Sequence, residues 1–343
     1  MPIHGAPAMR LSTLLAGLTD ALLVHDPEIV GITLDSRAVQ PGWLFIAVPG
    51  ARTDGRAYIA GAYARGAVAV VYEVDGFEPD ARSASAIGVR ALRQHIGTIA
   101  DRFYGAPTRK LKVVGVTGTN GKTTTTHLLA QALDRPDARC GLIGTLGSGF
   151  PGQLDPSLHT TPDAVSVHRL MAEFVRAGAR RVCMEVSSHA LDQARVAGVV
   201  FDIAVFTNLT RDHLDYHGDM EAYAAAKSRL FDFPHLKAAV INQDDAFGRE
   251  LIERMRSRAQ ILSFGLHGGD VQALSVDTST EGLTLTIATP QGETRLRSPL
   301  LGRFNAANLL AALAVLLVAA APKRVGGPSR RSTPAPARIS TSR

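Results

Sequence analysis

Short apolar segments that alternate with amphipathic ones occupy the middle of this 343-residue chain, and they limit its fold more than any other feature. The apolar segments are rich in Val, Ile and Ala, which is typical of strands buried on both faces of a parallel sheet. Segments such as 124–133 and 164–177 between them have helical periodicity. This alternation predicts a doubly wound α/β domain. The expected strands are Lys112–Val116, Cys140–Ile143, Arg181–Val186, Ile203–Thr207, Ala238–Ile241 and Ile261–Phe264.

Residues 1–105 predict a separate, smaller α/β domain. Its strands are expected at Gly31–Leu34, Trp43–Val48 and Val68–Tyr72, with a helix over Gly88–Tyr104. We therefore expect a first domain over 1–105 and a central domain over 106–321.

Two alternating runs follow the expected parallel sheet and predict a small antiparallel ribbon. They are Val271–Val276 and Leu283–Ile287, and an apolar helix is expected after them over Asn305–Ala321. Its longest apolar run, 309–321, is shorter than the roughly 20 residues of a membrane helix, so we expect a buried helix.

The excess positive charge lies at the end of the sequence. Residues 322–343 hold six of the 37 Lys and Arg and none of the 31 Asp and Glu, so the rest of the chain is formally neutral. This distribution argues against a nucleic-acid surface, and the Pro-, Ser- and Arg-rich composition predicts a disordered basic tail. Cys140 and Cys183 match no metal spacing, and the first residues make a poor secretory signal. We expect a cytoplasmic protein with no membrane or nucleic-acid partner.

A glycine-rich segment, Gly115–Thr124, follows the first expected central strand and opens a helix. Such a loop turns backbone N–H groups toward phosphate oxygens, and the helix N-terminus adds a positive dipole end. Lys122 would reach the β- and γ-phosphates, and the Thr123 hydroxyl would bind Mg²⁺. The strict pattern has its first glycine at 116, where this chain has Val116. Strand, loop, Lys-Thr and helix together predict nucleotide binding.

Two further strand ends carry polar side chains. Glu185 ends one buried strand, where a nucleotide-bound metal finds a carboxylate, although an acid there also fits a helix cap or a salt bridge. The segment Phe206–Gly218 contains two His, two Asp and an Arg after another strand. Such loops bind ligands in parallel sheets. We expect His213 to ligate a second metal and His217 to be structural.

Together these segments resemble the Mur ligase family, ATP-dependent ligases that build the peptidoglycan stem peptide. The resemblance extends from Thr33-Leu-Asp-Ser-Arg37 to Gly302-Arg-Phe-Asn-Ala-Ala-Asn308. Glu185–Leu191 and the run from Asn208 to Lys227 are similar to the members that add 2,6-diaminopimelate.

The resemblance implies a UDP-MurNAc-binding first domain followed by a P-loop ATPase-type central domain. It implies two Mg²⁺ ions, with Thr123 and Glu185 on one and His213 on the other. Lys227 matches a lysine that the family carries as a carbamate formed from CO₂, which would also face the metals. The implied ATP-binding residues are Gly118, Thr119, Asn120, Gly121, Lys122, Thr123, Thr124 and, near the base, Asn305.

The implied substrates are UDP-MurNAc-L-Ala-D-Glu and an amino acid, expected to be meso-diaminopimelate. ATP would convert the D-Glu side-chain carboxylate, a poor electrophile, into an acyl phosphate that the amine attacks. The implied substrate-binding residues are Leu34, Ser36, the turn 51–55, Thr160, Thr161, Ser187, Gln193 and Arg195. His159 stands where some relatives have Asn.

The family has a third, C-terminal domain that holds the amino acid, and residues 322–343 are too few for it. We expect that domain to be absent, and the chain to be truncated and monomeric. We expect it to bind ATP–Mg²⁺ and the UDP-sugar but to form no amide bond alone, since no amine would be positioned. The alternatives are a lysine-adding, other Mur or folylpolyglutamate-type ligase, and a non-catalytic nucleotide- and UDP-sugar-binding protein. A GTPase-like switch is disfavoured because the sequence has no Asn-Lys-x-Asp run.

Overall fold

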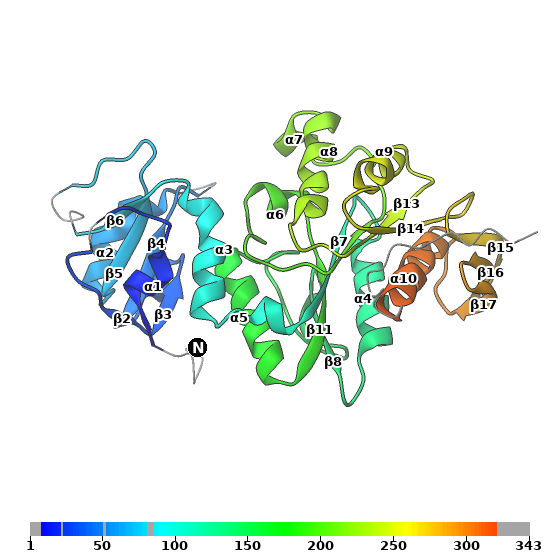
Figure 1. The fold of residues 1–343 in the computed structure, drawn as a ribbon, viewed down its shortest axis with the longest axis horizontal. Helices are drawn as coiled ribbons and strands as arrows, with labels where there is room; N and C mark the ends of the chain where they lie inside the picture. Colours follow the sequence, from blue (N-terminus) through cyan, green and yellow to red (C-terminus); the bar gives the residue numbers. More distant parts are fainter. Residues whose placement is uncertain (1–7, 22, 51–52, 81–84, 321–343) are drawn as a thin grey trace, which may run out of the picture.

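The computed structural model describes residues 8–21, 23–50, 53–80 and 85–320. Two sheets, each with its own helices, follow one another along the chain (Figure 1). A short antiparallel pair, β1 (Met9–Arg10) and β2 (Glu28–Ile29), precedes them. The expected tail 322–343 and the predicted helix end at Ala321 lie outside the described residues.

The first part is a parallel four-stranded sheet in the order β3-β4-β5-β6. Its strands are β3 (Gly31–Thr33), β4 (Trp43–Ala47), β5 (Ala69–Glu73) and β6 (Ile87–Val89). Its helices are α1 (Leu11–Leu15), α2 (Ile59–Ala64) and α3 (Leu92–Phe103), with 3₁₀ turns η1 (Ser36–Ala38), η2 (Gly55–Tyr58) and η3 (Pro107–Lys110).

The three strands predicted in this part are confirmed, but the predicted start of the helix at Gly88 is wrong. Residues 87–89 instead form β6, whose Gly88 pairs with Tyr72 of β5. A Cβ at position 88 would lie 2.5 Å from Val74 Cγ1, so only glycine fits in this strand. The helix begins at Leu92.

The second part is built on an eleven-stranded sheet in the order β10-β9-β8-β11-β7-β12-β13-β14-β15-β16-β17. All six predicted central strands are present, adjacent and parallel. They are β7 (Lys112–Thr117), β8 (Arg139–Gly144), β11 (Ala179–Glu185), β12 (Ile203–Phe206), β13 (Ala238–Asn242) and β14 (Gln260–Gly265).

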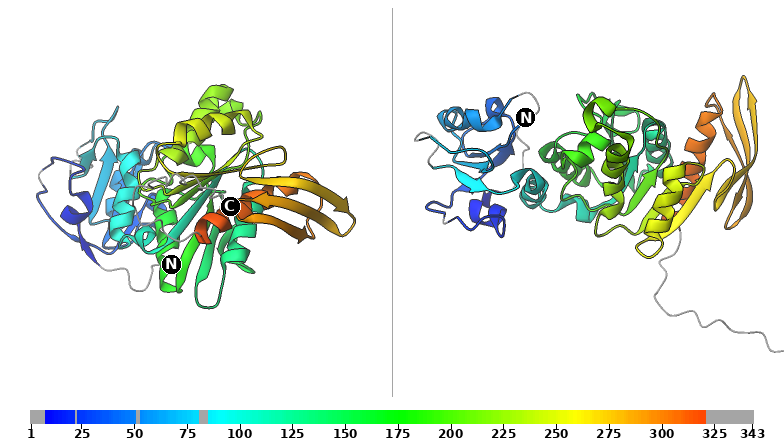
Figure 2. Two further views of the ribbon diagram at one scale, coloured as in Figure 1. Left: turned by 45° about the vertical axis from the view of Figure 1, so that its right-hand side comes forward. Right: turned by 90° about the horizontal axis from the view of Figure 1, so that it is seen from above.

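Further strands extend this sheet at both edges: β15 continues it parallel to β14 and begins an antiparallel ribbon, and at the other edge β9 pairs antiparallel with β8. The predicted ribbon is present as β15 (Val271–Ser279) and β16 (Gly282–Thr289), and β17 (Gly292–Ser298) adds a polar third strand that the alternation did not predict. The hairpin of β9 (Gly147–Phe150) and β10 (Gln153–Asp155) was also not predicted, because it is short and glycine-rich. In Figure 2 the ribbon β15–β17 projects from the central sheet beside the last helix.

Helices cover both faces of the central sheet, as a doubly wound fold requires. One core contains Leu129 and Leu310, and the other contains Met171 and Leu251. The helices are α4 (Lys122–Leu133), α5 (Ala164–Arg176), α6 (Ser188–Asp192), α7 (Leu214–His217), α8 (Met220–Ser228), η4 (Arg229–Asp232), α9 (Ala246–Met255) and α10 (Phe304–Ala320). No helix among the described residues is long and apolar enough to cross a membrane.

The two parts share a hydrophobic core where α3 meets α5, as Figure 1 shows near the middle of the molecule. Leu92 and Ile96 of α3 pack in the same cluster as Ala164 and Val165 of α5. Elsewhere in the core, Cys140 and Cys183 are buried free thiols whose sulfur atoms lie 3.8 Å apart.

Candidate nucleotide and substrate site

The glycine-rich segment connects β7 to α4 as a tight loop over residues 118–121. Gly118 and Gly121 have φ values of +147° and +84°, which favour glycine. A Cβ would lie 1.9 Å from Thr207 Oγ1 at Gly118 and 2.3 Å from Asn308 Oδ1 at Gly121. Gly115 is not part of this loop: it lies within β7, where a Cβ would be 2.7 Å from the Phe201 ring. Gly115 lies one residue before the first glycine of the strict phosphate-loop pattern. The close packing of β7 against Phe201 explains why a glycine stands there.

The end of β12 holds the loop in this shape. Thr119 N donates to Asn208 O at 2.8 Å, and Asn120 N donates to Asn208 Oδ1 at 2.9 Å. Thr207 Oγ1 donates to Asn120 O at 2.6 Å. The loop thus leads rigidly into the N-terminus of α4, whose first N–H groups have no partner within the helix and favour an anion.

Two lysines converge on this loop from different helices. Lys122 Nζ donates to Gly118 O at 2.9 Å and to Thr119 O at 2.8 Å, and Lys227 Nζ also donates to Gly118 O at 2.9 Å. Burial lowers the pKa of Lys122. Burial, and then the charge of Lys122, lower the pKa of Lys227 to about 7. The side chain of Lys227 is only 1% exposed, so it is not a solvated lysine on the surface of its helix.

Aromatic rings surround the Lys227 amine. Its Nζ lies 4.2 Å from the centre of the Tyr223 ring, whose hydroxyl is 3.2 Å from Thr119 Oγ1. His213 is half-exposed, and its ring centre lies 6.0 Å from that of Tyr223. His217 Nε2 is within hydrogen-bond distance of Ser188 Oγ, at 3.0 Å, and the structural role we expected for it remains a prediction.

Glu185, fully buried at the end of β11, faces the start of α4. Its Oε2 accepts from Thr123 Oγ1 at 2.9 Å, and its Oε1 accepts from Thr145 N at 2.8 Å. A carboxylate and a hydroxyl side by side suit Mg²⁺, which also takes phosphate and water oxygens. No cluster of three or more His, Cys, Asp or Glu among the described residues could hold a metal ion by itself. A metal here would therefore share the Thr123–Glu185 oxygens with a nucleotide.

Hydrogen bonds join the residues expected to hold the dipeptide into one group, which also includes the backbone carbonyl of Glu185. Thr161 Oγ1 donates to Glu185 O at 2.8 Å and accepts from Ser187 N at 3.2 Å. Arg195 donates to Thr161 O at 2.9 Å and to Gln193 Oε1 at 2.7 Å. Burial lowers the pKa of Arg195.

The other expected threonine joins this group through β8. Thr145 Oγ1 donates to Glu185 Oε2 at 3.1 Å, and it lies 3.0 Å from Thr160 Oγ1, whose hydroxyl can donate to it. His159 instead lines a neighbouring cavity of about 360 Å³ between the β9–β10 hairpin and α5.

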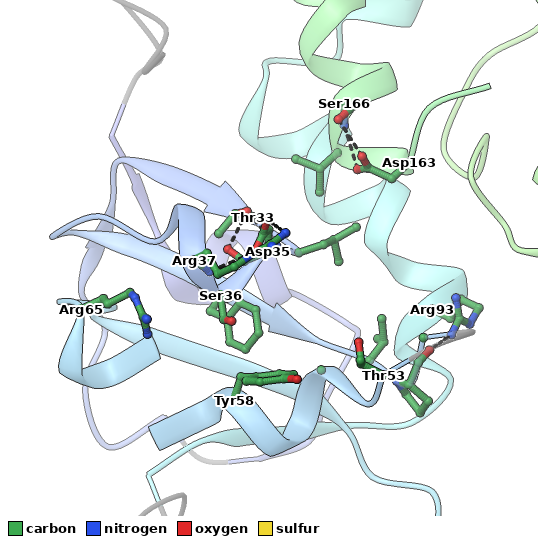
Figure 3. A pocket seen from close by; sticks show the side chains of 17 residues that line it. Thr33, Asp35, Ser36, Arg37, Thr53, Tyr58, Arg65, Arg93, Asp163 and Ser166 are labelled. Carbon is green, nitrogen blue, oxygen red and sulfur yellow. Dashed lines mark hydrogen bonds and ion pairs between the residues drawn. The ribbon is translucent and has the colours of Figure 1, made fainter. Parts of the chain in front are cut away.

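A larger cavity, of about 760 Å³, lies between the first sheet and the N-terminus of α5 (Figure 3). Leu34 and Ser36, both expected to bind the UDP-sugar, line it, as do Thr53 and Gly55 of the expected turn. Residues 51–52 of that turn lie outside the described residues. Three further lining residues were not predicted, because they come from separate elements: Tyr58, Arg65 and Arg93.

Asn305 is buried rather than open to a ligand. Its Nδ2 donates to Leu301 O at 2.8 Å, and its Oδ1 accepts from Asn308 Nδ2 at 2.9 Å. Asn308 and the exposed Phe304 line a cavity of about 70 Å³ beside Gly121. Asn305 thus holds the side chain of Asn308, which borders the loop. Neither Asn308 nor Phe304 was predicted from the sequence.

Two family models match the chain. The Mur ligase middle domain matches residues 116–316, and the model described as Mur ligase family, catalytic domain, matches residues 28–104. The chain belongs to the Mur ligase family.

Individual relatives carry a more specific name. The chain is 51% identical over 312 residues to the UDP-N-acetylmuramoyl-L-alanyl-D-glutamate--2,6-diaminopimelate ligase of Ectopseudomonas mendocina, and 53% identical over 312 residues to that of Pseudomonas aeruginosa. Each match covers 90% of this chain and 63% of the relative, so the chain spans about 63% of their length. A solved structure of a ligase with this name matches 94% of this chain and 68% of its own, with 34% identity and a TM-score of 0.80.

Proposed function

We propose that this protein serves an ATP-dependent ligase reaction that joins meso-diaminopimelate to the D-Glu side-chain carboxylate of UDP-MurNAc-L-Ala-D-Glu, and that this chain by itself carries the reaction as far as the acyl phosphate. The observation that carries the proposal is the central position of Glu185. Its carboxylate contacts Thr123 at the phosphate-binding loop, and its backbone carbonyl contacts Thr161 in the group that includes Arg195. The relatives with this name, at about 50% identity, support the same activity.

The residues of the loop have distinct roles in this proposal. The N–H groups of residues 118–124 bind ATP phosphates at the N-terminus of α4, and Lys122 leaves its present carbonyl partners to reach the β- and γ-phosphates. Thr123 and Glu185 would hold one Mg²⁺, and His213 would face a second. When bound, these ions would supply positive charge to the phosphates. Asn308 and Phe304 border the nucleotide, with Asn305 behind them.

The second substrate spans the two parts of the chain. We assign the UDP group to the cavity of about 760 Å³, where the domain we place at 1–105 meets the domain at 106–321. Arg65 and Arg93 provide positive charge for a diphosphate there. The muramoyl-dipeptide then passes Thr160, Thr161 and Ser187, and Gln193 and Arg195 bind its anionic end.

The chemistry follows from this placement. An oxygen of the D-Glu carboxylate bonds to the γ-phosphorus of ATP as the bond to the β-bridging oxygen breaks, so ADP leaves and an acyl phosphate forms. The amine nitrogen of the amino acid then bonds to the acyl carbon, phosphate leaves and the amine loses a proton. Lys122 offsets the negative charge that gathers as the carboxylate meets the triphosphate.

We further propose that Lys227 carries a carbamate. With a pKa near 7, about half of its amines are neutral at pH 7, and the neutral lone pair is what attacks CO₂. The N–C bond forms, a proton leaves, and a buried cation beside Lys122 becomes an anion. This change replaces repulsion between the two lysines by attraction.

If Lys227 carries a carbamate, ¹³C NMR of the protein in ¹³C-bicarbonate should show a carbamate signal. Because the folded-state pKa is lowered, the neutral fraction increases as the pH rises through about 7, so the signal should grow between pH 6 and pH 8. Lys227→Met should remove this signal, and Lys110→Met, at an exposed site, should keep it. Wild-type protein with no signal at pH 8 would refute the carbamate.

A binding experiment separates the proposed function from the alternatives. Calorimetric titration of the whole chain with UDP-MurNAc-L-Ala-D-Glu should show one saturable site that UDP competes for and an ATP analogue does not. A folylpolyglutamate-type ligase would instead bind a reduced folate and ignore UDP. A lysine-adding enzyme would bind the same UDP-sugar, and it is distinguished by which amine, L-lysine or meso-diaminopimelate, enters the product once the domain that holds the amino acid is supplied.

A further inference from the structure

Helix α3 of the first part contacts the turn 193–198 of the second part backbone to backbone. A Cβ on Gly97 of α3 would lie only 1.8 Å from Ala197 O and 2.4 Å from Ala197 C. From the other side, a Cβ on Gly198 would lie 2.8 Å from Gly97 C. Any side chain at position 97 must therefore push the turn away from the helix.

A buried histidine fixes the same turn from a second helix. His168 of α5 is fully buried, and its Nε2 lies 3.0 Å from Ala197 O, within hydrogen-bond distance. Its Nδ1 lies 3.5 Å from Asp101 Oδ1 on α3. His168 thus joins the turn to α5 and lies against Asp101 of α3 at the junction of the two parts.

The turn 193–198 contains two of the residues that we assign to the dipeptide end of the substrate, Gln193 and Arg195. Arg195 stands two positions before Ala197, and its side chain bonds to Gln193 and Thr161. The backbone bends sharply between Gln193 and Arg195, because Ala194 has a φ of +54°. Ala197 N donates to Ala194 O at 3.1 Å across Arg195, so a shift of Ala197 will also move Arg195.

Helix α3 also contributes a residue to the large cavity. Arg93 lies four residues before Gly97, one helical turn away, and lines the cavity that we assign to the UDP group. The contact between Gly97 and Ala197 therefore sets how far Arg93 stands from Arg195.

We propose that Gly97 and His168 are positioning residues that fix the spacing between Arg93 and Arg195, and so select a ligand whose two anionic ends are that far apart. The inference rests on the proposed function, in which the UDP group and the dipeptide carboxylates are those two ends. In this proposal the contact between α3 and the turn 193–198 determines which length of substrate binds, although this contact does not itself touch the ligand.

Gly97→Ala tests this proposal. Alanine favours a helix more than glycine does, so weaker binding would not come from the loss of helix propensity. We expect the affinity for UDP-MurNAc-L-Ala-D-Glu to fall at least tenfold. The affinities for UDP, which fills only the large cavity, and for an ATP analogue should change less than twofold. Gln94→Ala, on the exposed side of the same helix, is the matched control and should bind all three ligands like the wild type.

Equal loss for all three ligands, or no loss for the long one, would overturn the proposal. Amide hydrogen exchange of Arg195 and Val196 in the ligand-free chain gives a second readout, which should become faster in Gly97→Ala and stay unchanged in Gln94→Ala. If Gly97→Ala does not fold, His168→Leu should show the same pattern, and His168→Gln, which restores a donor for Ala197 O, should recover part of the affinity.

The two proposals fail in different ways. Wild-type protein that does not bind UDP-MurNAc-L-Ala-D-Glu would refute the proposed function. Wild-type protein that binds it, with unchanged amide exchange and unchanged affinity in Gly97→Ala, would refute only the positioning role.

Discussion

Replacing Lys122 by alanine is expected to weaken ATP binding by about 100-fold, or about 2.8 kcal/mol. The ammonium group, now bonded to two loop carbonyls, lies at the loop where the phosphates would bind. Charge-assisted hydrogen bonds contribute about 1.5–3 kcal/mol each, and loss of one accounts for this change. Calorimetric titration with ATP–Mg²⁺ measures the effect.

The matched control is Lys110→Ala, which removes an exposed lysine at the end of η3. It should bind ATP like the wild type. The far-ultraviolet circular dichroism of both variants should match that of the wild type, because water can solvate the carbonyls of Gly118 and Thr119 once the ammonium is gone. Undiminished ATP affinity in Lys122→Ala would contradict the assignment of the loop.

Glu185→Gln is expected to remove most of the increase in ATP affinity that Mg²⁺ produces. The substitution keeps the side-chain shape and leaves one oxygen to accept from Thr123 or Thr145, but it removes the negative charge that a hard cation needs. We expect ATP without metal to bind the variant about as well as it binds the wild type. Titrations with ATP in EDTA and in excess Mg²⁺ measure the difference.

Glu173→Gln provides a charge-matched control, since Glu173 is half-exposed and pairs with Arg169 on the surface of α5. It should retain the full effect of Mg²⁺. If Glu185→Gln also retained it, Glu185 would be a structural acid that ties β11 to β8 and α4, which is the other interpretation its position allowed.

The sequence predicted the parts of the fold that local pattern determines. Buried parallel strands are continuous apolar runs, so all six central strands were found, and the glycines at 118 and 121 indicated the phosphate loop. Gly88 was misread as the start of a helix, and the glycine at 115 has no explanation in the loop pattern, for the same reason: each lies against a side chain, Val74 or Phe201, that comes close only in the folded chain.

The site was less predictable where its residues come from separate elements. Arg65 and Arg93 carry no local signal, and they meet only because the first sheet, α2 and α3 surround one cavity. The low exposure of Lys227 likewise depends on Tyr223 and on the loop from β7, which no periodicity of α8 indicates. Asn308 lies one turn after the predicted Asn305, and only the orientation of α10 decides which of them borders the loop.

The central claim, that this chain brings the D-Glu carboxylate to the γ-phosphate of ATP, is tested most directly by trapping with hydroxylamine. Hydroxylamine diffuses freely and attacks an acyl phosphate to give a hydroxamate and phosphate, so it needs no site for an amino acid. With ATP, Mg²⁺ and UDP-MurNAc-L-Ala-D-Glu, the wild-type chain should yield hydroxamate and ADP in equal amounts, and Lys122→Ala should yield neither. ADP release that does not depend on the UDP-sugar, or no hydroxamate from a chain that binds both substrates, would contradict it.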